Sequence, residues 1–365
     1  MKRILHGLGS LEQGGAETYT LRYINFDKDN EHIVICGQGK TGVLEEEFKK
    51  RSRIITDIHF GRIFGDYIKF YKFLKKEKID VYWQGGVAGG STISLLVAQL
   101  AGVKRRILYY RSSSWYWDGK DYFHIKELYM KLIDKICSKS VNTILANSYS
   151  AINNYHPNLP ANKYKVIYNG INKESISKKT KKEIRELLNI PNEAFVVGHS
   201  GRLNSAKNHK MIVKAALTLC HKYSNMYFVL MGLNVDKEYR DLIKSEGLEK
   251  QILLLGYRND VMDILKGLDL YYFPSITEGQ PNALLEAMVS GLPFVASNIG
   301  PIKECTPNNL VPYLVDPYDE EQNISAIESL YNDPEKLYER SCEEWALKRF
   351  DAETQFQLFK EELEK

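Results

Sequence analysis

Short apolar runs, rich in β-branched and aromatic residues, alternate with segments of helical periodicity along the whole chain. A charged stretch without such a run, 173–186, separates them into two series. Because strands that alternate with helices form parallel sheets covered on both faces, each series predicts a Rossmann-like, doubly wound α/β domain. The first series comprises Arg3–His6, Ile33–Cys36, Ile54–Ile58, Val81–Trp83, Arg106–Tyr110, Thr143–Ala146 and Lys165–Tyr168, and the second comprises Phe195–His199, Tyr227–Met231, Ile252–Leu255, Leu270–Phe273, Phe294–Ala296 and Tyr313–Val315.

The two series meet near a turn at 169–171, which sets the domain boundary. We expect an N-terminal domain at 1–170 and a C-terminal domain at 171–344. The amphipathic segment at about 345–365 predicts a terminal helix that packs back on the first domain. Ligands of parallel sheets bind at the carboxyl ends of the strands. Two such sheets facing each other would therefore hold the chemistry in the cleft between them.

The composition is that of an ordinary globular protein, with 44% hydrophobic and 26% charged residues among 365. It excludes a mainly disordered or fibrous chain. Five cysteines are scattered without a C-x-x-C pair, so neither a disulfide framework nor a zinc cluster is indicated. The first residues form no secretory signal core, and the uncharged stretch 81–103 is interrupted by glycines and polar residues, which favours a strand, a loop and a helix over a membrane span. We expect a cytoplasmic protein.

Positive charge is concentrated in the first half of the chain. Residues 1–170 hold 26 Lys and Arg against 16 Asp and Glu, giving +10, whereas residues 171–365 hold 24 against 30, giving −6. A basic half suggests an anionic partner, either a membrane or a nucleic acid. No nucleic-acid-binding signature accompanies the charge, which favours the membrane.

The segment 64–78 offers one place for membrane contact. Its helical pattern puts Phe64, Tyr67, Ile68, Tyr71 and Leu74 on one side, extended by Phe70 and Phe73, beside a basic stripe of Lys69, Lys72 and Lys76. Aromatic residues next to lysines suit a helix that lies on an anionic bilayer. The alternative is an ordinary helix that covers the first sheet.

Two turns after predicted strands can contact phosphate. Gly14 and Gly15 precede a helical pattern, where glycines allow a phosphate to approach the N–H groups of the helix start. Their spacing is not that of a G-x-G-x-x-G fingerprint, which argues against a dehydrogenase. In the second half, Arg202 and Lys207 lie in one loop after a strand, where they suit the oxygens of a diphosphate. A plain turn and a solvated basic loop are the respective alternatives.

A third stretch, 274–288, combines two carboxylates with a helix start. Glu278 lies in a loop after a predicted strand, Pro281 is placed to begin a helix, and Glu286 lies on its first turns. A carboxylate among apolar neighbours needs hydrogen-bond donors, which the hydroxyls of a sugar or ribose would supply. A capping or exposed helix carboxylate is the alternative for Glu286.

These stretches together resemble glycosyltransferase family 4, which comprises retaining nucleotide-sugar transferases of the GT-B fold. The resemblance is to bacterial surface-polysaccharide enzymes of capsule and lipopolysaccharide synthesis. It spans nearly the whole chain. It rests on Gly-Gly-Ala-Glu at 14–17, Gly-Arg-Leu-x-x-x-Lys-x-His at 201–209, Pro-Ser-x-x-Glu-Gly-x-Pro-Asn-x-Leu-Leu-Glu-Ala-Met at 274–288, Asn147-Ser148, Tyr168-Asn169-Gly170-Ile171, Gly256 before Asp260-Val261, and Gly291-Leu292-Pro293.

The resemblance implies a role for each matching residue. Arg202 and Lys207 would hold the donor diphosphate and steady the charge on the leaving group, Glu286 would hold the ribose, and Glu278 would lie near the donor sugar. We therefore name Arg202, Lys207 and Glu278 as candidate catalytic residues. The candidate donor-binding residues are Gly14, Gly15, Gly201, Arg202, Lys207, Gly232, Tyr257, Arg258, Glu278, Gly279, Gln280, Pro281, Asn282, Ala283, Leu284 and Glu286, with His209 at the edge of the site.

One loop departs from the family pattern. Many relatives carry a histidine after the strand that corresponds to Arg106–Tyr110, but Arg111 stands here. A guanidinium cannot act as a general base, so this loop is better suited to bind an anionic acceptor than to remove a proton. The candidate acceptor residues are Arg111, Ser112, Trp115 and Asn147; a structural aromatic cluster is the alternative for Trp115.

The sequence thus predicts a retaining glycosyltransferase of the hexosyltransferase type, which needs no metal or other cofactor because fixed cations stabilise the leaving diphosphate. The expected donor is a UDP-sugar, with a GDP-sugar as the alternative. The expected acceptor is a hydroxyl of a glycan or lipid-linked glycan, reached from the inner face of the cell membrane. A sugar-nucleotide epimerase and a non-catalytic nucleotide-sugar-binding protein are the competing functions.

Overall fold

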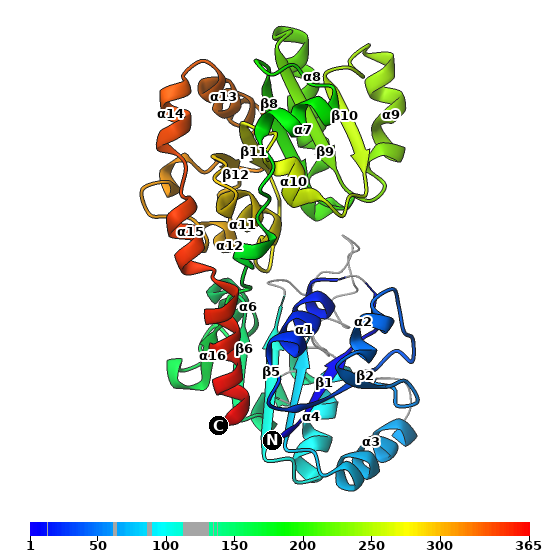
Figure 1. Ribbon diagram of the computed structural model, residues 1–365. Coiled ribbons are helices and arrows are strands. Elements are labelled where there is room, and N and C mark those ends of the chain that lie inside the picture. Colours follow the sequence, from blue (N-terminus) through cyan, green and yellow to red (C-terminus); the bar gives the residue numbers. More distant parts are fainter. Residues whose placement is uncertain (13, 61–63, 86–89, 112–130, 134, 137) are drawn as a thin grey trace. The chain divides into compact units, whose positions relative to one another are not determined.

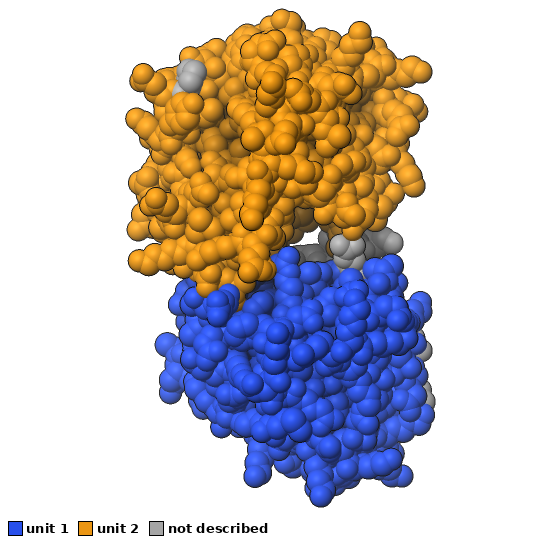
Figure 2. Space-filling model, in the orientation of Figure 1, with its two compact units in different colours: residues 1–170, 353–365 blue, residues 171–352 orange. Residues whose placement is uncertain are grey.

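The computed structural model describes the chain apart from residues 13, 61–63, 86–89, 112–130, 134 and 137. The chain divides into two compact units, which are coloured separately in Figure 2. Unit 1 comprises Met1–Gly170 and Glu353–Lys365, and unit 2 comprises Ile171–Ala352. Each unit is built around one parallel sheet (Figure 1).

The sheet of unit 1 has seven described strands. They are β1 (Arg3–Leu8), β2 (Glu31–Cys36), β3 (Ser52–Ile55), β4 (Val81–Gly85), β5 (Arg105–Tyr110), β6 (Thr143–Ala146) and β7 (Tyr164–Val166). The helices of this part are α1 (Gly15–Phe26), α2 (Glu45–Lys49), α3 (Phe64–Glu77), α4 (Gly90–Leu100) and α6 (Tyr149–Tyr155), with short 3-10 turns at Ser138–Ser140 and Ala161–Lys163. The strand order is β3-β2-β1-β4-β5-β6-β7, and all the pairings are parallel.

Both faces of this sheet are buried, which explains why its strands are apolar throughout rather than alternating. On one face, Leu5 and Leu108 share a core with Phe70 of α3 and Leu95 of α4. The other face lies under α1 and the C-terminal helix α16 (Ala352–Glu364). There the Phe359 ring lies 5.3 Å from that of Trp83, between ring centres.

The helix α16 is fixed to unit 1 by charge as well as by aromatic packing. Glu362 is buried and pairs with Arg105 at 3.0 Å and with Lys165 at 3.2 Å. Lys360 pairs with the buried Asp27 at 3.3 Å. A buried carboxylate is costly unless it is paired in this way, so these contacts fix the register of α16 on the sheet.

The sheet of unit 2 has five described strands. They are β8 (Phe195–Ser200), β9 (Met226–Met231), β10 (Ile252–Gly256), β11 (Leu270–Phe273) and β12 (Phe294–Ala296). The helices are α7 (Lys181–Leu188), α8 (His209–Lys222), α9 (Val235–Ser245), α10 (Val261–Leu265), α11 (Asn282–Val289), α12 (Gly300–Glu304), α13 (Glu320–Tyr331), α14 (Pro334–Glu339) and α15 (Glu343–Arg349), with 3-10 turns at Lys173–Ser175, Ser205–Lys207 and Val311–Tyr313. The strand order is β10-β9-β8-β11-β12, again parallel.

One predicted strand is wrong. The apolar run Tyr313–Val315 forms the end of a 3-10 turn and a single bridge from Val315 to Ser297, because the turn contains Pro312 and leaves too few residues to form a ladder. The strand predicted at Ile54–Ile58 is also shifted, since β3 ends at Ile55. The uncharged stretch 81–103 contains β4 and α4, as expected. None of the helices in the described ranges is long and apolar enough to cross a membrane.

Candidate functional site

Two loops at the carboxyl end of the unit 2 sheet are joined by hydrogen bonds to backbone carbonyls. The loop after β8 carries Arg202 and Lys207, and the loop after β11 carries Glu278. The N–H of Ile276 donates to the carbonyl of Ala206 at 2.8 Å, and the Asn208 side chain donates to the Pro274 carbonyl at 3.1 Å. The strand order places β8 beside β11, which is why residues about 70 positions apart meet here.

Lys207 and Glu278 form an ion pair in this junction. The ammonium Nζ of Lys207 lies 2.6 Å from Oε1 of Glu278, and the side chains are only 18% and 10% exposed. The ammonium also lies 4.8 Å from the centre of the Phe273 ring, a cation–π contact. Two residues that the sequence put in one site are thus in direct contact. The sequence analysis did not name Phe273 as a site residue, because a phenylalanine in a strand has the same sequence pattern as a core residue.

Glu286 lies on α11, the helix that follows the Glu278 loop. Its side chain is half-buried. Burial raises the pKa of the Tyr271 hydroxyl, and the negative charges of Glu286 and Glu278 act in the same direction. The hydrogen bonds between Tyr271 and Ser200 lower this pKa. The Tyr271 hydroxyl lies 2.7 Å from the Ser200 Oγ at the end of β8. Both carboxylates therefore act electrostatically on one buried tyrosine, which the sequence analysis did not name.

Arg202 behaves differently from Lys207. It is exposed, while its loop is anchored on either side by the bonds from Gly201 N–H to the Met231 carbonyl at 2.9 Å and from Leu203 N–H to the Leu233 carbonyl at 3.0 Å. The backbone position of Arg202 is therefore fixed, and its side chain faces solvent.

Two buried histidines are hydrogen-bonded to backbone carbonyls next to this loop. The Nε2 of His209 lies 3.1 Å from the Gly201 carbonyl, and the Nδ1 of His199 lies 2.9 Å from the Tyr272 carbonyl, so each of these nitrogens is assigned the proton. Burial lowers the pKa of both rings, that of His199 to about 3. Both rings are therefore neutral near pH 7 and act as hydrogen-bond donors to the backbone.

Glycine is required where the loops after β8, β9 and β10 approach one another. A Cβ at Gly232, whose φ is +157°, would lie 1.9 Å from the Gly201 carbonyl oxygen. Next to it, Gly256 accepts the N–H of Gly232 at 2.7 Å and has a φ of +62°. Tyr257 then follows with 56% of its surface exposed, and Arg258 forms an ion pair with Asp260. Of the two donor-binding candidates in this loop, Tyr257 thus presents its side chain to solvent and Arg258 is held by Asp260.

The turn into α11 differs in one detail from the prediction. Pro281 does not begin the helix but caps it, with φ −80° and ψ 72°, and α11 begins at Asn282. Gln280, Pro281 and Leu284 are buried, whereas Gly279, Asn282 and Ala283 are half-buried. The N–H groups of this turn lie in the same loop cluster as Glu278, because residues 279–283 directly follow it.

The predicted turn of unit 1 begins α1. Gly14 is the N-cap with extended backbone, and Gly15 is exposed with nothing within 4 Å of a Cβ built on it. A Cβ on Gly14 would lie 2.4 Å from Oε2 of Glu17, so the carboxylate folds over the helix start. Burial raises the pKa of Glu17, and nearby Arg111 acts in the opposite direction.

Arg111 stacks on two tyrosines of unit 1. Its guanidinium carbon lies 4.0 Å from the Tyr19 ring centre and 5.0 Å from that of Tyr109. Its Nη2 donates to Asn169 Oδ1 at 2.6 Å and to the Gly15 carbonyl at 3.3 Å. The Nε and Nη1 atoms are buried and find no hydrogen-bond partner among the described residues.

Of the other predicted acceptor residues, Asn147 is buried and donates to the Arg111 carbonyl at 3.3 Å. Ser112 and Trp115 lie outside the described residues.

The described residues contain no cluster of three or more His, Cys, Asp or Glu side chains suited to a metal ion. The Asp-x-Asp triplet at 27–29 follows α1 and is engaged elsewhere, because Asp27 accepts the Tyr23 hydroxyl at 3.1 Å and Lys360 pairs with Asp27 and Asp29.

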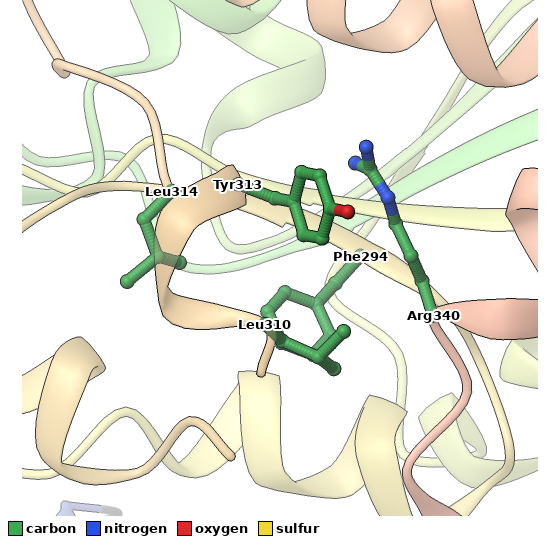
Figure 3. A pocket seen from close by; sticks show the side chains of 5 residues that line it. All are labelled: Phe294, Leu310, Tyr313, Leu314 and Arg340. Atoms are coloured by element: carbon green, nitrogen blue, oxygen red, sulfur yellow. The ribbon is translucent and has the colours of Figure 1, made fainter. Parts of the chain in front are cut away.

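A surface hollow on unit 2 is distinct from these loops (Figure 3). It is lined by Phe294, Leu310, Tyr313, Leu314 and Arg340. The guanidinium of Arg340 lies 4.0 Å from the Tyr313 ring centre and is the only charged group of the lining. With no residue from the loops after β8 and β11, this hollow takes no part in the site.

Comparison with known proteins agrees with this geometry. Family models described as "Glycosyltransferase Family 4" and "Glycosyl transferases group 1" match residues 13–175 and 180–345, respectively.

Two curated relatives are similar over most of the chain. The capsular polysaccharide biosynthesis glycosyltransferase CapH of Staphylococcus aureus is 28% identical over 82% of this chain and 82% of its own. A UDP-Gal:α-D-GlcNAc-diphosphoundecaprenol α-1,3-galactosyltransferase of Escherichia coli is 28% identical over 73% of this chain and 70% of its own.

Among solved structures, HepE of Anabaena in complex with UDP has a TM-score of 0.79, with 22% identity and full coverage of both chains. The predicted GT-B fold is confirmed by this likeness and by the two parallel-sheet units. The two family matches, which together take in most of the sequence, show that the chain belongs to the family 4 glycosyltransferases.

Proposed function

We propose that this protein is a retaining glycosyltransferase that moves a sugar from a nucleoside diphosphate sugar to a hydroxyl of a growing surface glycan. A UDP-sugar is the preferred donor, since HepE, which shares the fold, binds UDP and the E. coli relative is named for a UDP-Gal donor. Relatives are named for capsule and for diphosphoundecaprenol-linked acceptors, which supports a glycan or lipid-linked glycan as the acceptor.

The chemistry follows from the charges of unit 2. When the bond between the anomeric carbon and the phosphate oxygen breaks, positive charge develops on the carbon and negative charge on the diphosphate. Lys207 and Arg202, on one anchored loop, would stabilise the diphosphate, which lowers the barrier without a metal. The acceptor hydroxyl would attack from the face that the diphosphate leaves, and its proton would pass to the departing phosphate oxygen. This gives a glycoside of unchanged configuration and a free nucleoside diphosphate.

The observation that carries this proposal is the contact of Lys207 with Glu278, where the loops after β8 and β11 are joined. Incubation with a panel of nucleotide sugars and a hydroxyl acceptor tests it. One nucleotide sugar should release its nucleoside diphosphate, and NMR of the product should show the anomeric configuration of the donor. An epimerase would convert the sugar without releasing the nucleotide, and a binding protein would leave it intact. Either result would overturn the proposal.

We also propose that unit 1 contacts an anionic membrane through α3 and α4. The structure revises the expected surface, because Phe70 and Leu74 are buried under the sheet while Ile68 and Tyr71 remain exposed beside Lys69 and Lys72. Leu96 and Leu100 of α4, which packs on α3, are also exposed. The helix therefore covers the sheet and keeps an outer surface of lysines and apolar tips, which suits an anionic bilayer.

Vesicle sedimentation tests this surface. The triple variant Lys69→Gln, Lys72→Gln, Lys76→Gln should bind vesicles rich in anionic lipid at least tenfold more weakly than the parent chain at low salt, since each lysine contributes about 1 kcal/mol near such a membrane. A triple change of the exposed Lys237, Lys244 and Lys250 on unit 2 is the control. Equal vesicle binding by the parent, the α3 variant and the unit 2 control would show that this surface does not bind the membrane.

A further inference from the structure

We infer that Glu278 makes the donor site select a nucleotide that carries its sugar over the bare nucleoside diphosphate, because the Glu278 carboxylate holds the ammonium of Lys207 when no sugar is present. This inference rests on the proposed function and concerns the same site. It assigns Glu278 a role in specificity and in product release.

The ion pair is built into the fold rather than formed by two mobile surface chains. The two loops are tied by the bonds from Ile276 to Ala206 and from Asn208 to Pro274. Asn208 also donates to the Pro317 carbonyl at 2.8 Å, which adds a third anchor. The ammonium of Lys207 is backed by the Phe273 ring. Both charges therefore face each other where the two loops are joined.

Solvent screens this pair only weakly. With 18% and 10% of the side chains exposed, the interaction between the charges is stronger than that of a surface pair. Removing one partner from a pair of this kind is costly, because the other charge stays partly desolvated. Any ligand that draws Lys207 away from Glu278 must offset that cost.

A diphosphate by itself cannot offset it. Its oxygens compete for the Lys207 ammonium but are acceptors only, and their negative charge repels the Glu278 carboxylate. A diphosphate that still carries a sugar brings hydroxyl donors, and a carboxylate can accept these in place of the lysine. A site built to hydrogen-bond a hydroxyl rejects the analogue that lacks it, since its own polar group loses a partner. Donor and product are thus distinguished by one carboxylate.

The same argument links this selectivity to turnover. Once the sugar has left, its hydroxyls are no longer attached to the diphosphate, and Glu278 again competes for Lys207. Re-formation of the 2.6 Å pair therefore favours release of the nucleoside diphosphate.

Titration calorimetry of UDP, with GDP in parallel, tests the inference on the full chain. Glu278→Gln removes the competing charge and keeps the shape of the side chain, so it should bind UDP about tenfold more tightly than the parent. In a Lys207→Met background the same change should have a smaller effect, because the competition for the ammonium is then absent and only the repulsion between the carboxylate and the diphosphate is relieved. A purely structural role for the pair predicts the opposite sign, since loosened loops would bind UDP more weakly.

Two controls keep the outcome decisive. Glu249→Gln, an exposed carboxylate of unit 2, makes the same change in net charge and should alter UDP affinity less than twofold. Glu278→Asp keeps the charge on a shorter side chain, so its UDP affinity should lie between those of the parent and Glu278→Gln. This variant provides the test if the glutamine variant does not fold. Equal or weaker UDP binding by a folded Glu278→Gln chain overturns the inference and leaves the proposed function standing. Absence of binding of either nucleotide by the parent chain overturns both.

Discussion

Lys207 in unit 2 and Arg111 in unit 1 are two cations in similar settings with different partners. Each follows a parallel strand and lies over an aromatic ring, Phe273 for the lysine and Tyr19 for the arginine. Lys207 is neutralised by the carboxylate of Glu278, whereas the hydrogen bonds of Arg111 go to the neutral oxygens of Asn169 and Gly15. Within the described ranges, no carboxylate lies within ion-pair distance of Arg111.

The difference separates two ways of binding an anion. A cation paired with a carboxylate exchanges one anion for another, so its affinity depends on what the ligand offers the displaced carboxylate. A cation whose described hydrogen bonds go to neutral oxygens has no hydrogen-bonded carboxylate to give up before an incoming anion binds, and among the described residues its Nε and Nη1 have no hydrogen-bond partner. We therefore expect unit 2 to select among nucleotides and unit 1 to attract an anionic group of the acceptor.

The largest effect should follow from Lys207→Ala. Loss of the ammonium removes charge stabilisation at the leaving diphosphate, and the rate of sugar transfer should fall by two or more powers of ten, about 3 kcal/mol. Product formation under saturating donor measures this. Lys210→Ala, an exposed lysine on α8, should leave the rate within twofold. A Lys207→Ala rate close to that of the parent would remove the lysine from the reaction.

A smaller effect is expected for Arg111→Gln. The neutral side chain keeps the hydrogen bond to Asn169 but loses the charge, so transfer to an anionic acceptor should fall about tenfold while UDP affinity stays the same. Arg111→Lys should recover only part of the loss, because an ammonium lacks the planar group that stacks on Tyr19. Arg22→Gln, an exposed change on α1, is the control. A drop in UDP affinity with unchanged acceptor dependence would place Arg111 on the donor instead.

The sequence predicted most of the fold because parallel strands buried on both faces leave an unmistakable pattern. The apolar runs Leu270–Phe273 and Phe294–Ala296 are β11 and β12 residue for residue. The prediction failed at Tyr313–Val315, where the residues are equally apolar but form the end of a 3-10 turn and a single bridge from Val315 to Ser297. Apolar composition reports burial, and only the partners of a segment decide whether it forms a strand.

The candidate site was predicted less evenly. Motif spacing pointed to Lys207 and Glu278, and the sheet order brings them into contact. Their backing by Phe273, and the electrostatic action of both carboxylates on Tyr271, could not be predicted, since strand aromatics have the same sequence signature as core. Nor could the stacking of Arg111 on Tyr19, because the two residues are 92 positions apart and nothing in the pattern pairs them.

The last expected effect is on folding stability rather than on rate, and it concerns the histidine beneath the Lys207 loop. Burial lowers the pKa of His199 to about 3, well under its value in an unfolded chain. Below about pH 6.5 the unfolded chain therefore binds a proton that the folded chain does not, so His199 reduces stability as the pH falls and has no such effect above that range. The contribution is about 1.4 kcal/mol per pH unit between roughly pH 6 and 4.

Urea unfolding at pH 7, 6 and 5 measures this slope. His199→Asn keeps a donor for the Tyr272 carbonyl but does not titrate, so its stability should fall less with acid than that of the parent. The exposed His221→Asn should keep the parental slope. Since Lys207 also lowers the pKa of His199, binding of UDP beside that ammonium should reduce the acid sensitivity of the parent. Identical slopes for the parent and His199→Asn would mean that the His199 ring is not the group whose protonation lowers the stability.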